Sequence, residues 1–351
     1  HLQWHLAEAP RASNGGGGSG GADDGDLRAI ESVQELHDRF SLVYEMPETV
    51  FDAQEHKLVP LSSMRNVCTS RMVHRSWMES RDKRIARQAE VGFDPGGEDA
   101  QVKCNLWGGW PTTAAPGACG RLLELLRYLC SNESDGGKLY GWVLNWLAYP
   151  LQHPGAKMKT ALVMHGPQGT GKNLFFEAYM AMYGEYGRIV DQAAIEDKFN
   201  DWASKKLFLI GDEVVARQEL FHTKNKLKGF ITGEWIRINP KNVAAHEERN
   251  HVNIVFLSNE RQPLVIEKDD RRFTVIWTPE KLARGFYDEV SAEIKAGGIP
   301  ALHDHLLNFD LGDFRPWTEP AMTGAKAALI AISLASVERF IADWMNGETA
   351  F

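Results

Sequence analysis

Four short apolar runs between residues 160 and 278 are each bounded by polar residues. Runs of this length are typical of fully buried strands, and segments with helical periodicity lie between some of them. Continuous apolar strands that alternate with helices predict a parallel sheet covered on both faces. We therefore expect an α/β core over residues 156–279, with strands in TALVMH, KKLFLIGDE, HVNIVFLSNE and RRFTVIWT.

The pattern changes on both sides of this core. Leucines and tryptophans recur at three- and four-residue steps in residues 119–155, which predicts a helical segment there. Residues 27–118 mix short strand-like runs with turns, so we expect a mixed α+β region that includes a helix over 76–91. Residues 280–351 are again predicted to be helical.

The first part of the chain has a different composition. Residues 1–26 include the run RASNGGGGSGGADDGD, which offers almost nothing to bury and predicts a flexible linker. The chain starts at His1 without an initiator Met. We therefore expect that it is a piece of a longer chain or a processed product, and that another domain lay upstream.

Overall composition limits the classes of protein to consider. With 43% hydrophobic and 25% charged residues, the 351-residue chain resembles ordinary globular proteins. No apolar run approaches the roughly 18 residues of a membrane span and no signal peptide is visible, so we expect no membrane partner and a cytoplasmic location. The four scattered cysteines are typical of reduced thiols. A net charge of −8 argues against a surface that is basic throughout, but not against nucleic acid in a local basic channel.

The first stretch with recognisable chemistry is GPQGTGKN, which follows directly on TALVMH. It fits the phosphate-loop pattern G-x-x-x-x-G-K-[ST] except at the last position, where Asn173 replaces the hydroxyl that normally contacts Mg²⁺. The glycines let backbone N–H groups approach phosphates, and Lys172 would reach the β- and γ-phosphates of ATP. A chance glycine turn is the alternative, which the flanking strand and helix disfavour. The predicted nucleotide-binding residues are Gly166, Pro167, Gln168, Gly169, Thr170, Gly171, Lys172 and Asn173.

The second stretch is LFLIGDE, in which an apolar strand ends in Asp212 and Glu213. Ligands of parallel sheets bind at the carboxyl ends of the strands, so both carboxylates would lie near the glycine loop. We expect Asp212 to hold Mg²⁺ and Glu213 to orient or deprotonate the attacking water. Asn173 would be the second metal-contacting residue, since a carboxamide oxygen is an acceptable hard ligand.

Two further polar positions complete the set. Asn259 ends the strand NIVFLSNE, and its amide could sense a γ-phosphate and help to place the water; the alternative is an ordinary turn residue. In DDRRF, Arg271 or Arg272 could act as an arginine finger across a subunit boundary, and Arg272 is preferred because it directly precedes the strand. The alternative for these arginines is a surface ion pair with Asp269 or Asp270.

Taken together, the Walker A-like GPQGTGKN, the Walker B-like LFLIGDE, the sensor-like FLSNE and DRRF resemble a superfamily 3 helicase of the AAA+ class. The chain is similar in particular to the phage- and poxvirus-type primase-helicases, also in YGWVLNWLAYPLQHPGAK and LKGFITGEWIRINPKN. The resemblance implies an AAA+ P-loop fold, a collar-like role for 119–155, and a homo-oligomeric, hexameric ring driven by ATP. It also implies movement on single-stranded DNA, usually 3′ to 5′, and a primase domain or protein as partner.

Residues 235–253 are expected to form a strand, a turn region and a second strand, because Trp235 alternates with apolar Ile236 in a half-exposed pattern. In the family that the chain resembles, a hairpin here lines the pore and carries a basic residue to DNA. Lys241 matches that place best, with Arg249 and His251 as weaker candidates. A solvated hairpin of mixed charge is the alternative. Three nearby lysines could equally be a solvated helix face or a contact to a subunit or phosphate: Lys224, Lys226 and Lys228.

Other features are expected to be structural. His303 and His305 stand two apart on a predicted helix, point away from each other, and are expected to be exposed. Four tryptophans are predicted to pack in the protein interior and not to stack on bases: Trp107, Trp110, Trp142 and Trp146. Two rival functions stay open at this point, a P-loop small-molecule kinase and an AAA+ scaffold or loader that does not unwind DNA.

Overall fold

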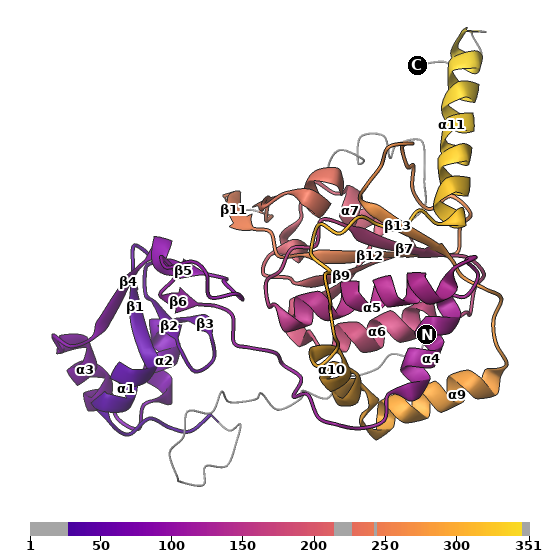
Figure 1. Cartoon of the computed structure of the whole chain (residues 1–351). Coiled ribbons are helices and arrows are strands. Elements are labelled where there is room, and N and C mark those ends of the chain that lie inside the picture. Colours follow the sequence, from indigo (N-terminus) through magenta and orange to yellow (C-terminus); the bar gives the residue numbers. More distant parts are fainter. Residues whose placement is uncertain (1–26, 214–226, 242–243, 346–351) are drawn as a thin grey trace. The chain divides into compact units, whose positions relative to one another are not determined.

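The computed structural model describes residues 27–213, 227–241 and 244–345 (Figure 1). The chain divides into two compact units, one up to Pro111 and one from Thr112 onward. The expected linker over 1–26 lies outside the described residues. The other predicted boundaries, at 118, 155 and 279, stay predictions.

The first unit is built on a four-stranded sheet with strand order β3-β2-β1-β4. β1 pairs antiparallel with β2 and parallel with β4. Leu36, Phe40, Met64 and Trp77 are buried together between this sheet and its helices. The elements of this unit are α1 Val33–Arg39, β1 Phe40–Tyr44, β2 Thr49–Asp52, β3 Lys57–Pro60, α2 Leu61–Val67, α3 Arg71–Glu79, β4 Arg84–Arg87, η1 Gln88–Glu90, β5 Val91–Gly92 and β6 Cys104–Asn105.

The expected helix over 76–91 is wrong beyond Glu79. α3 ends at Glu79, and Arg84–Arg87 form β4 in place of a helix. Ala86 is the only buried residue of β4, so the apolar pattern of this short strand is too weak to read from the sequence. Its pairing with β1 decides its conformation.

The second unit contains a five-stranded, fully parallel sheet with order β13-β7-β12-β9-β8. Four of these strands are the predicted apolar runs: β7 Ala161–His165, β9 Phe208–Asp212, β12 Asn253–Ser258 and β13 Phe273–Trp277. The fifth, β8 Gly187–Asp191, lies at the edge with only Val190 buried and was not predicted. Figure 1 shows helices on both faces of the sheet, with α5 and α6 on one and α7 on the other. The predicted α/β core with a central parallel sheet is therefore confirmed.

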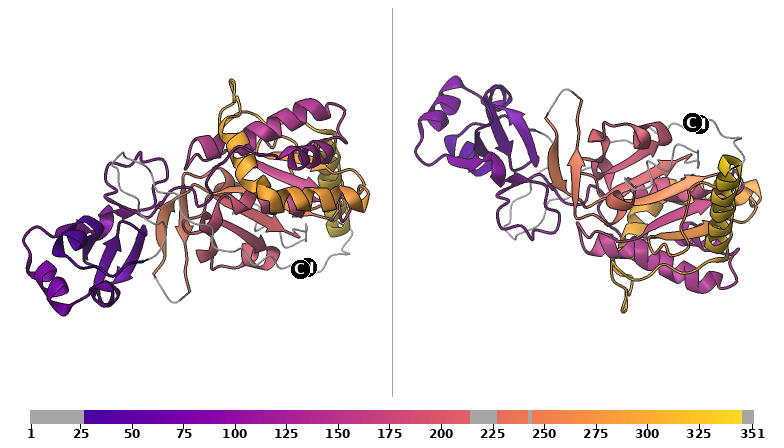
Figure 2. Two further views of the ribbon diagram at one scale, coloured as in Figure 1. Left: turned by 90° about the horizontal axis from the view of Figure 1, so that it is seen from below. Right: turned by 90° about the horizontal axis from the view of Figure 1, so that it is seen from above.

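The remaining elements of this unit surround the sheet. They are α4 Gly120–Leu129, α5 Gly136–Gln152, α6 Lys172–Ala181, η2 Gly184–Tyr186, α7 Gln192–Glu196, η3 Asp201–Ala203, β10 Trp235–Ile238, β11 His246–Arg249, α9 Arg284–Glu293, the π-turn η4 Ile294–Gly298, α10 Ile299–Leu307 and α11 Gly324–Met345. β10 and β11 pair antiparallel as a hairpin that extends away from the parallel sheet (Figure 2). The strand, turn and strand expected over 235–253 are thus present.

The expectation of exposed histidines on α10 is wrong, since His303 is 1% exposed and His305 is partly buried. The position of His303 faces the neighbouring elements because α10 packs on α5 and α6, so burial lowers the pKa of this imidazole. Trp146 is buried as expected, and its indole N–H donates to Thr160. The four cysteines are free. In the described part of the chain, none of the helices is both long and apolar enough to cross a membrane.

Candidate active site

The glycine loop, residues 166–171, joins β7 to the amino end of α6. Gly166, Gly169 and Gly171 all have positive φ. A Cβ atom on Gly166 would lie 3.0 Å from the backbone N and O of Thr278, and one on Gly171 would lie 2.9 Å from Leu125. Both conformation and space therefore require glycine here. The result is a tight turn that presents the first N–H groups of α6 at the carboxyl edge of the sheet.

Lys172 begins α6 and is 4% exposed. Its ammonium donates to the carbonyl oxygens of Gly166 and Pro167, at 3.2 and 2.9 Å, and to Oδ1 of Asn259 at 3.2 Å. Burial lowers the pKa of this lysine to about 8, while Asp212 acts in the opposite direction. The lysine thus lies inside the loop and bridges it to the end of β12.

Asn173 is the next residue of α6 and contacts β9, the neighbour of β12 in the sheet. Its Nδ2 donates to Oδ1 of Asp212 over 3.1 Å. The two residues expected to contact a metal ion are therefore adjacent, and the amide contact leaves its Oδ1 as the acceptor of Asn173. Lys172 and Asn173, which are consecutive residues of α6, thus contact Asn259 after β12 and Asp212 of β9.

Glu213 follows β9 with an exposed side chain and a φ of 52°, in the left-handed region that residues with a side chain rarely adopt. Its backbone N–H donates to Oδ1 of Asp212 at 3.1 Å. Local strain of this kind persists where the surrounding structure enforces it, and it clusters at functional sites. The turn separates the exposed Glu213 from the more buried Asp212, in agreement with different roles for the two carboxylates.

Thr278 and His165 lie beside the glycine loop, and neither is among the predicted site residues. Thr278 is fully buried, and its Oγ1 lies 3.4 Å from Oγ1 of Thr170. Nδ1 of His165 contacts the carbonyl oxygen of Glu260 at 3.0 Å, and burial lowers the pKa of this imidazole. The signal for Thr278 is present in the sequence, since it follows an apolar strand as Asn259 does.

A third residue absent from the prediction is Glu177, one helical turn beyond Asn173 on the same face of α6. Burial raises the pKa of its carboxyl group, and the charge of Asp212 acts in the same direction. Glu177 therefore adds a third carboxyl group to the surroundings of Asp212. The four-residue spacing from Asn173 is the signal that could have found it.

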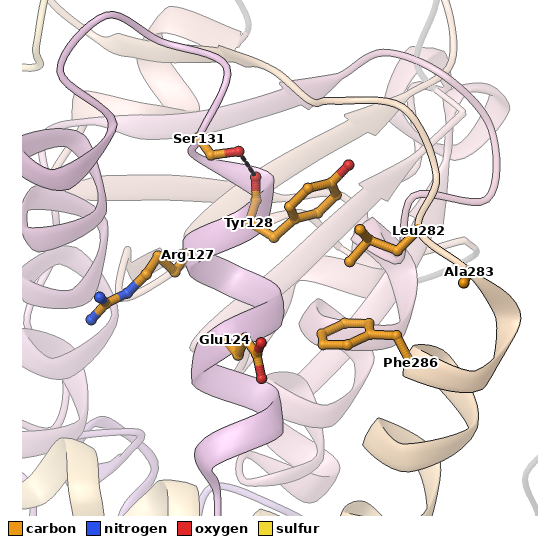
Figure 3. A pocket seen from close by; sticks show the side chains of 7 residues that line it. All are labelled: Glu124, Arg127, Tyr128, Ser131, Leu282, Ala283 and Phe286. Atoms are coloured by element: carbon orange, nitrogen blue, oxygen red, sulfur yellow. Dashed lines mark hydrogen bonds between the residues drawn. The ribbon is translucent and has the colours of Figure 1, made fainter.

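A pocket of ≈ 440 Å³ lies between α4 and the segment that leads into α9. In Figure 3 the rings of Tyr128 and Phe286 point into this space from opposite sides, whereas Arg127 points away from it. The helices beside the pocket also pack on the glycine loop, because a Cβ on Gly171 would lie 2.9 Å from Leu125 of α4 and 3.0 Å from the ring of Tyr287 of α9. The lining residues are Glu124, Arg127, Tyr128, Ser131, Leu282, Ala283 and Phe286.

Arg272 is not brought to this site. It directly precedes β13, so it lies at the amino edge of the sheet, and a five-residue strand separates the two edges by about 17 Å. Its Nη1 pairs with Oδ2 of Asp270 at 3.3 Å, which is the ion pair expected as the alternative. Arg271 is exposed. β13 therefore keeps both arginines too far from the glycine loop of their own chain to contact it.

Lys241 lies in the connection of the β10–β11 hairpin and is exposed. Lys228 forms an ion pair with Glu267. Lys224 and Lys226 lie outside the described residues. His251 is half-buried with Nδ1 at 2.7 Å from the carbonyl oxygen of Gly155, which leaves Lys241 and Arg249 as the exposed cations among the hairpin candidates.

Comparison with known proteins finds one matching family model and similar proteins encoded by viruses. A family of unknown function, DUF5906, matches residues 164–272, which include the glycine loop, Asp212, Glu213 and Asn259. The chain is 35% identical over 157 residues to a DNA primase-polymerase of Nitratiruptor phage NrS-1, a match that covers 44% of this chain and 22% of the phage protein. It is 31% identical over 110 residues to initiator protein NS1 of feline panleukopenia virus, covering 30% of this chain and 26% of that protein.

The fold has a solved counterpart. The structure of the NrS-1 C-terminal region matches with a TM-score of 0.67 and 22% identity, and the match covers 90% of this chain and 80% of that one. At this identity the likeness concerns the fold alone. The chain thus shares its fold with the C-terminal region of NrS-1, while its sequence matches span only about a quarter or less of the two curated relatives.

Proposed function

We propose that this chain is an ATP-hydrolysing replication protein that moves along single-stranded DNA as part of a homo-oligomeric, hexameric ring and unwinds duplex DNA. The observation that carries the proposal is the pair of contacts made by consecutive residues of α6. Lys172 holds Asn259, and Asn173 holds Asp212, at the edge where parallel sheets bind ligands. The similarity to a phage DNA primase-polymerase and a parvovirus initiator protein supports a role in replication.

The residues of this edge fit Mg²⁺-ATP. The loop N–H groups, the amino end of α6 and the ammonium of Lys172 all favour polyphosphate. Asp212 and the Oδ1 of Asn173 are hard oxygen ligands that a magnesium ion accepts. The pocket between α4 and the segment that leads into α9, with its two aromatic rings, would take the base. When bound, Mg²⁺ would neutralise phosphate charge and orient the oxygens.

The chain's own groups then have separate roles. Lys172 stabilises the charge on the phosphates, Asn259 detects the γ-phosphate through its contact with Lys172, and Glu213 positions the attacking water and accepts its proton. An arginine from the amino edge of a neighbouring subunit would complete the site, because no arginine of the same chain is brought there by β13. This requirement supports the proposal of an oligomer.

Lys241 would carry the DNA contact, and a primase domain or protein would act on the same strand. A small-molecule kinase would not need the β10–β11 hairpin or Asn259 beside Lys172. A scaffold or loader would not need Glu213 in a strained turn beside Asp212. We therefore rank both alternatives below the helicase.

The test is strand displacement on forked DNA with either a 3′ or a 5′ tail, combined with mass determination in the presence and absence of ATP. The proposal expects ATP-dependent displacement of one fork type, 3′-tailed if the family resemblance holds, and a ring mass with ATP. Assembly without displacement on either fork would favour the scaffold or loader. ATP turnover that single-stranded DNA does not stimulate would favour the kinase.

A further inference from the structure

We infer that Trp235 and Arg249 form a platform on which a base of single-stranded DNA stacks. The inference rests on the proposed function and adds a specific contact to it. Trp235 begins β10 and is 57% exposed. Arg249 ends β11 directly opposite in the register, with its guanidinium carbon 5.5 Å from the centroid of the indole ring. This is the distance of a cation–π contact.

The platform is firmly held at the base of the hairpin. The side chain of Asn250 donates to the carbonyl oxygens of Phe230 and Gly233, at 2.8 and 3.0 Å. Its backbone N–H donates to the carbonyl of Glu234 at 2.9 Å. The opposite face of β10 is anchored by Ile236 and Ile238, which are buried in the core. The exposed ring of Trp235 therefore belongs to a strand that hydrogen bonds and core packing hold in place.

The surroundings of the ring are charged. Side chains alternate along a strand, and directly opposite residues share a face, so Trp235, Arg237, Glu247 and Arg249 lie on one face of the hairpin. Trp235, Arg237, Glu247 and Arg249 are all exposed. Glu248 lies on the other face, where its carboxylate accepts hydrogen bonds from Oγ of Ser204 and the backbone N–H of Lys205.

Charge on this face favours nucleic acid. On the face that carries Trp235, Arg237 and Arg249 are exposed cations against the single carboxylate of Glu247, which leaves an excess of one positive charge. The whole chain carries −8. A local positive face on an acidic protein selects an anionic partner.

Chemistry then selects a single strand of DNA over an apolar subunit surface. An apolar partner would need aliphatic neighbours around the indole, whereas the neighbours on this face are charged. Every unpaired base offers a π-face that stacks on an aromatic ring, and an arginine on the same ring adds a cation–π contribution. Arg237 shares this face with Trp235, so it would contact a phosphate of a strand that stacks on the ring.

The experiment compares two oligonucleotides, a thymidine strand and a strand of equal length whose central nucleotides lack bases. Binding is measured by fluorescence anisotropy for the wild type, Trp235→Ala, Trp235→Phe and Trp317→Ala. Trp317 is the matched control, since it is also an exposed tryptophan, at 70%, but lies outside the hairpin. A salt titration is recorded for each protein.

Stacking predicts that Trp235→Ala binds the thymidine strand about tenfold more weakly than wild type and the abasic strand equally well. Trp235→Phe should keep most of the affinity, because it keeps a π-face, and Trp317→Ala should behave as wild type. The salt slope of Trp235→Ala should stay unchanged, since the substitution removes no cation that faces a phosphate.

Equal affinity of Trp235→Ala and wild type for the thymidine strand would overturn the platform while leaving the proposed function intact, provided that the wild type binds. Equal losses on both strands, with a lower assembled mass, would instead make Trp235 a subunit contact and overturn the platform. Failure of the wild type to bind either strand would overturn the proposed function and the platform together.

Discussion

The two ends of the five-stranded sheet carry similar residue types and use them differently. At the amino edge, Asp270 accepts from Arg272 and from the backbone N–H groups of Arg272 and Phe273, and its carbonyl accepts from Lys326. At the carboxyl edge, Lys172 and Asn173 contact side chains from two other strands, next to the exposed carboxylate of Glu213. The first arrangement holds segments of the chain together, and the second gathers charged groups around a glycine loop.

This difference gives the amino-edge charges a structural role within one chain. Lys326 is 1% exposed and connects α11 to the start of β13, and Asn253 connects β12 to residues 156 and 158. Positive φ occurs at both edges, at Lys205 before β9 and at Glu213 after it, but the glycine loop is found at the carboxyl edge. The comparison indicates that the carboxyl edge is built for a ligand, and that a catalytic arginine at the amino edge would have to serve a neighbouring subunit.

The largest effect is expected from substituting the two arginines of the amino edge one at a time. Because Arg272 pairs with Asp270, we now expect the exposed Arg271 to be the group that acts in trans. Arg271→Ala should lower ATP hydrolysis at least about a hundredfold, as removal of an arginine finger does in other nucleotide hydrolases. Mixing it with Lys172→Ala protein should restore part of the activity, because some interfaces then join an intact loop to an intact arginine.

Arg272→Ala is the matched control for that experiment. It should lower the melting temperature by a few degrees, since it removes one ion pair worth about 1–2 kcal/mol from a 24% exposed side chain, and it should keep most ATPase activity. If Arg272→Ala loses hydrolysis and is rescued in mixed rings while Arg271→Ala is not, the assignment returns to Arg272.

The metal contact at the carboxyl edge should give a smaller effect. Asn173→Ser should keep ATPase activity within about an order of magnitude, because a hydroxyl is the ligand of the consensus motif. Asn173→Ala should weaken Mg²⁺-ATP by up to about tenfold and metal-free ATP less, since it removes the amide beside Asp212. A magnesium titration of the three proteins measures this, and superimposable curves would show that Asn173 is not near the metal.

Titration of Lys172 sharpens the comparison further. Burial lowers the pKa of its ammonium to about 8, so the loop is cationic below that pH and loses its charge as the pH rises above it. Phosphate binding favours the charged form, so ATP affinity should fall roughly fivefold between pH 8 and pH 9 and binding should take up a proton there. Calorimetry in buffers of different ionisation enthalpy detects this uptake, and Lys172→Ala should show none. Absence of uptake by the wild type at pH 9 would contradict the role of Lys172.

Lys241→Ala should have the smallest effect on hydrolysis. Basal ATPase activity should persist, because the residue lies on the hairpin and not at the sheet edge. Binding of single-stranded DNA should weaken several-fold, and its salt slope should shrink by about 0.7 for each phosphate that is no longer neutralised. Identical salt titrations for mutant and wild type would remove Lys241 from the DNA-binding surface.

The sequence predicts most of the second unit because its strands are continuous apolar runs. β7, β9, β12 and β13 are found in this way, whereas β8 exposes most of its residues at the edge of the sheet and gives no such run. β4 was expected as part of a helix, since its pairing with β1 is a tertiary effect. His303 was expected to be exposed, although the packing of α10 buries it.

The site is predictable in its residue types but not in its contacts. The motif spacing indicates Lys172, Asp212 and Asn259, yet it does not say that consecutive residues of α6 hold different strands. Thr278, Glu177 and the Tyr128–Phe286 pocket depend on packing between elements far apart in the chain. The sequence allows either Asp269 or Asp270 as the partner of Arg272, and the structure shows that it is Asp270.

The most direct test of the account is ATP hydrolysis and ATP binding by the wild type, Lys172→Ala and Glu213→Gln, with and without single-stranded DNA. Lys103→Ala, an exposed lysine of the first unit, is the control. The account predicts DNA-stimulated turnover by the wild type and the control and none by Lys172→Ala. It also predicts ATP binding without turnover by Glu213→Gln, since Asp212 and the loop stay intact. Hydrolysis by Glu213→Gln at a rate close to wild type would contradict the assignment of the carboxyl edge as the catalytic site.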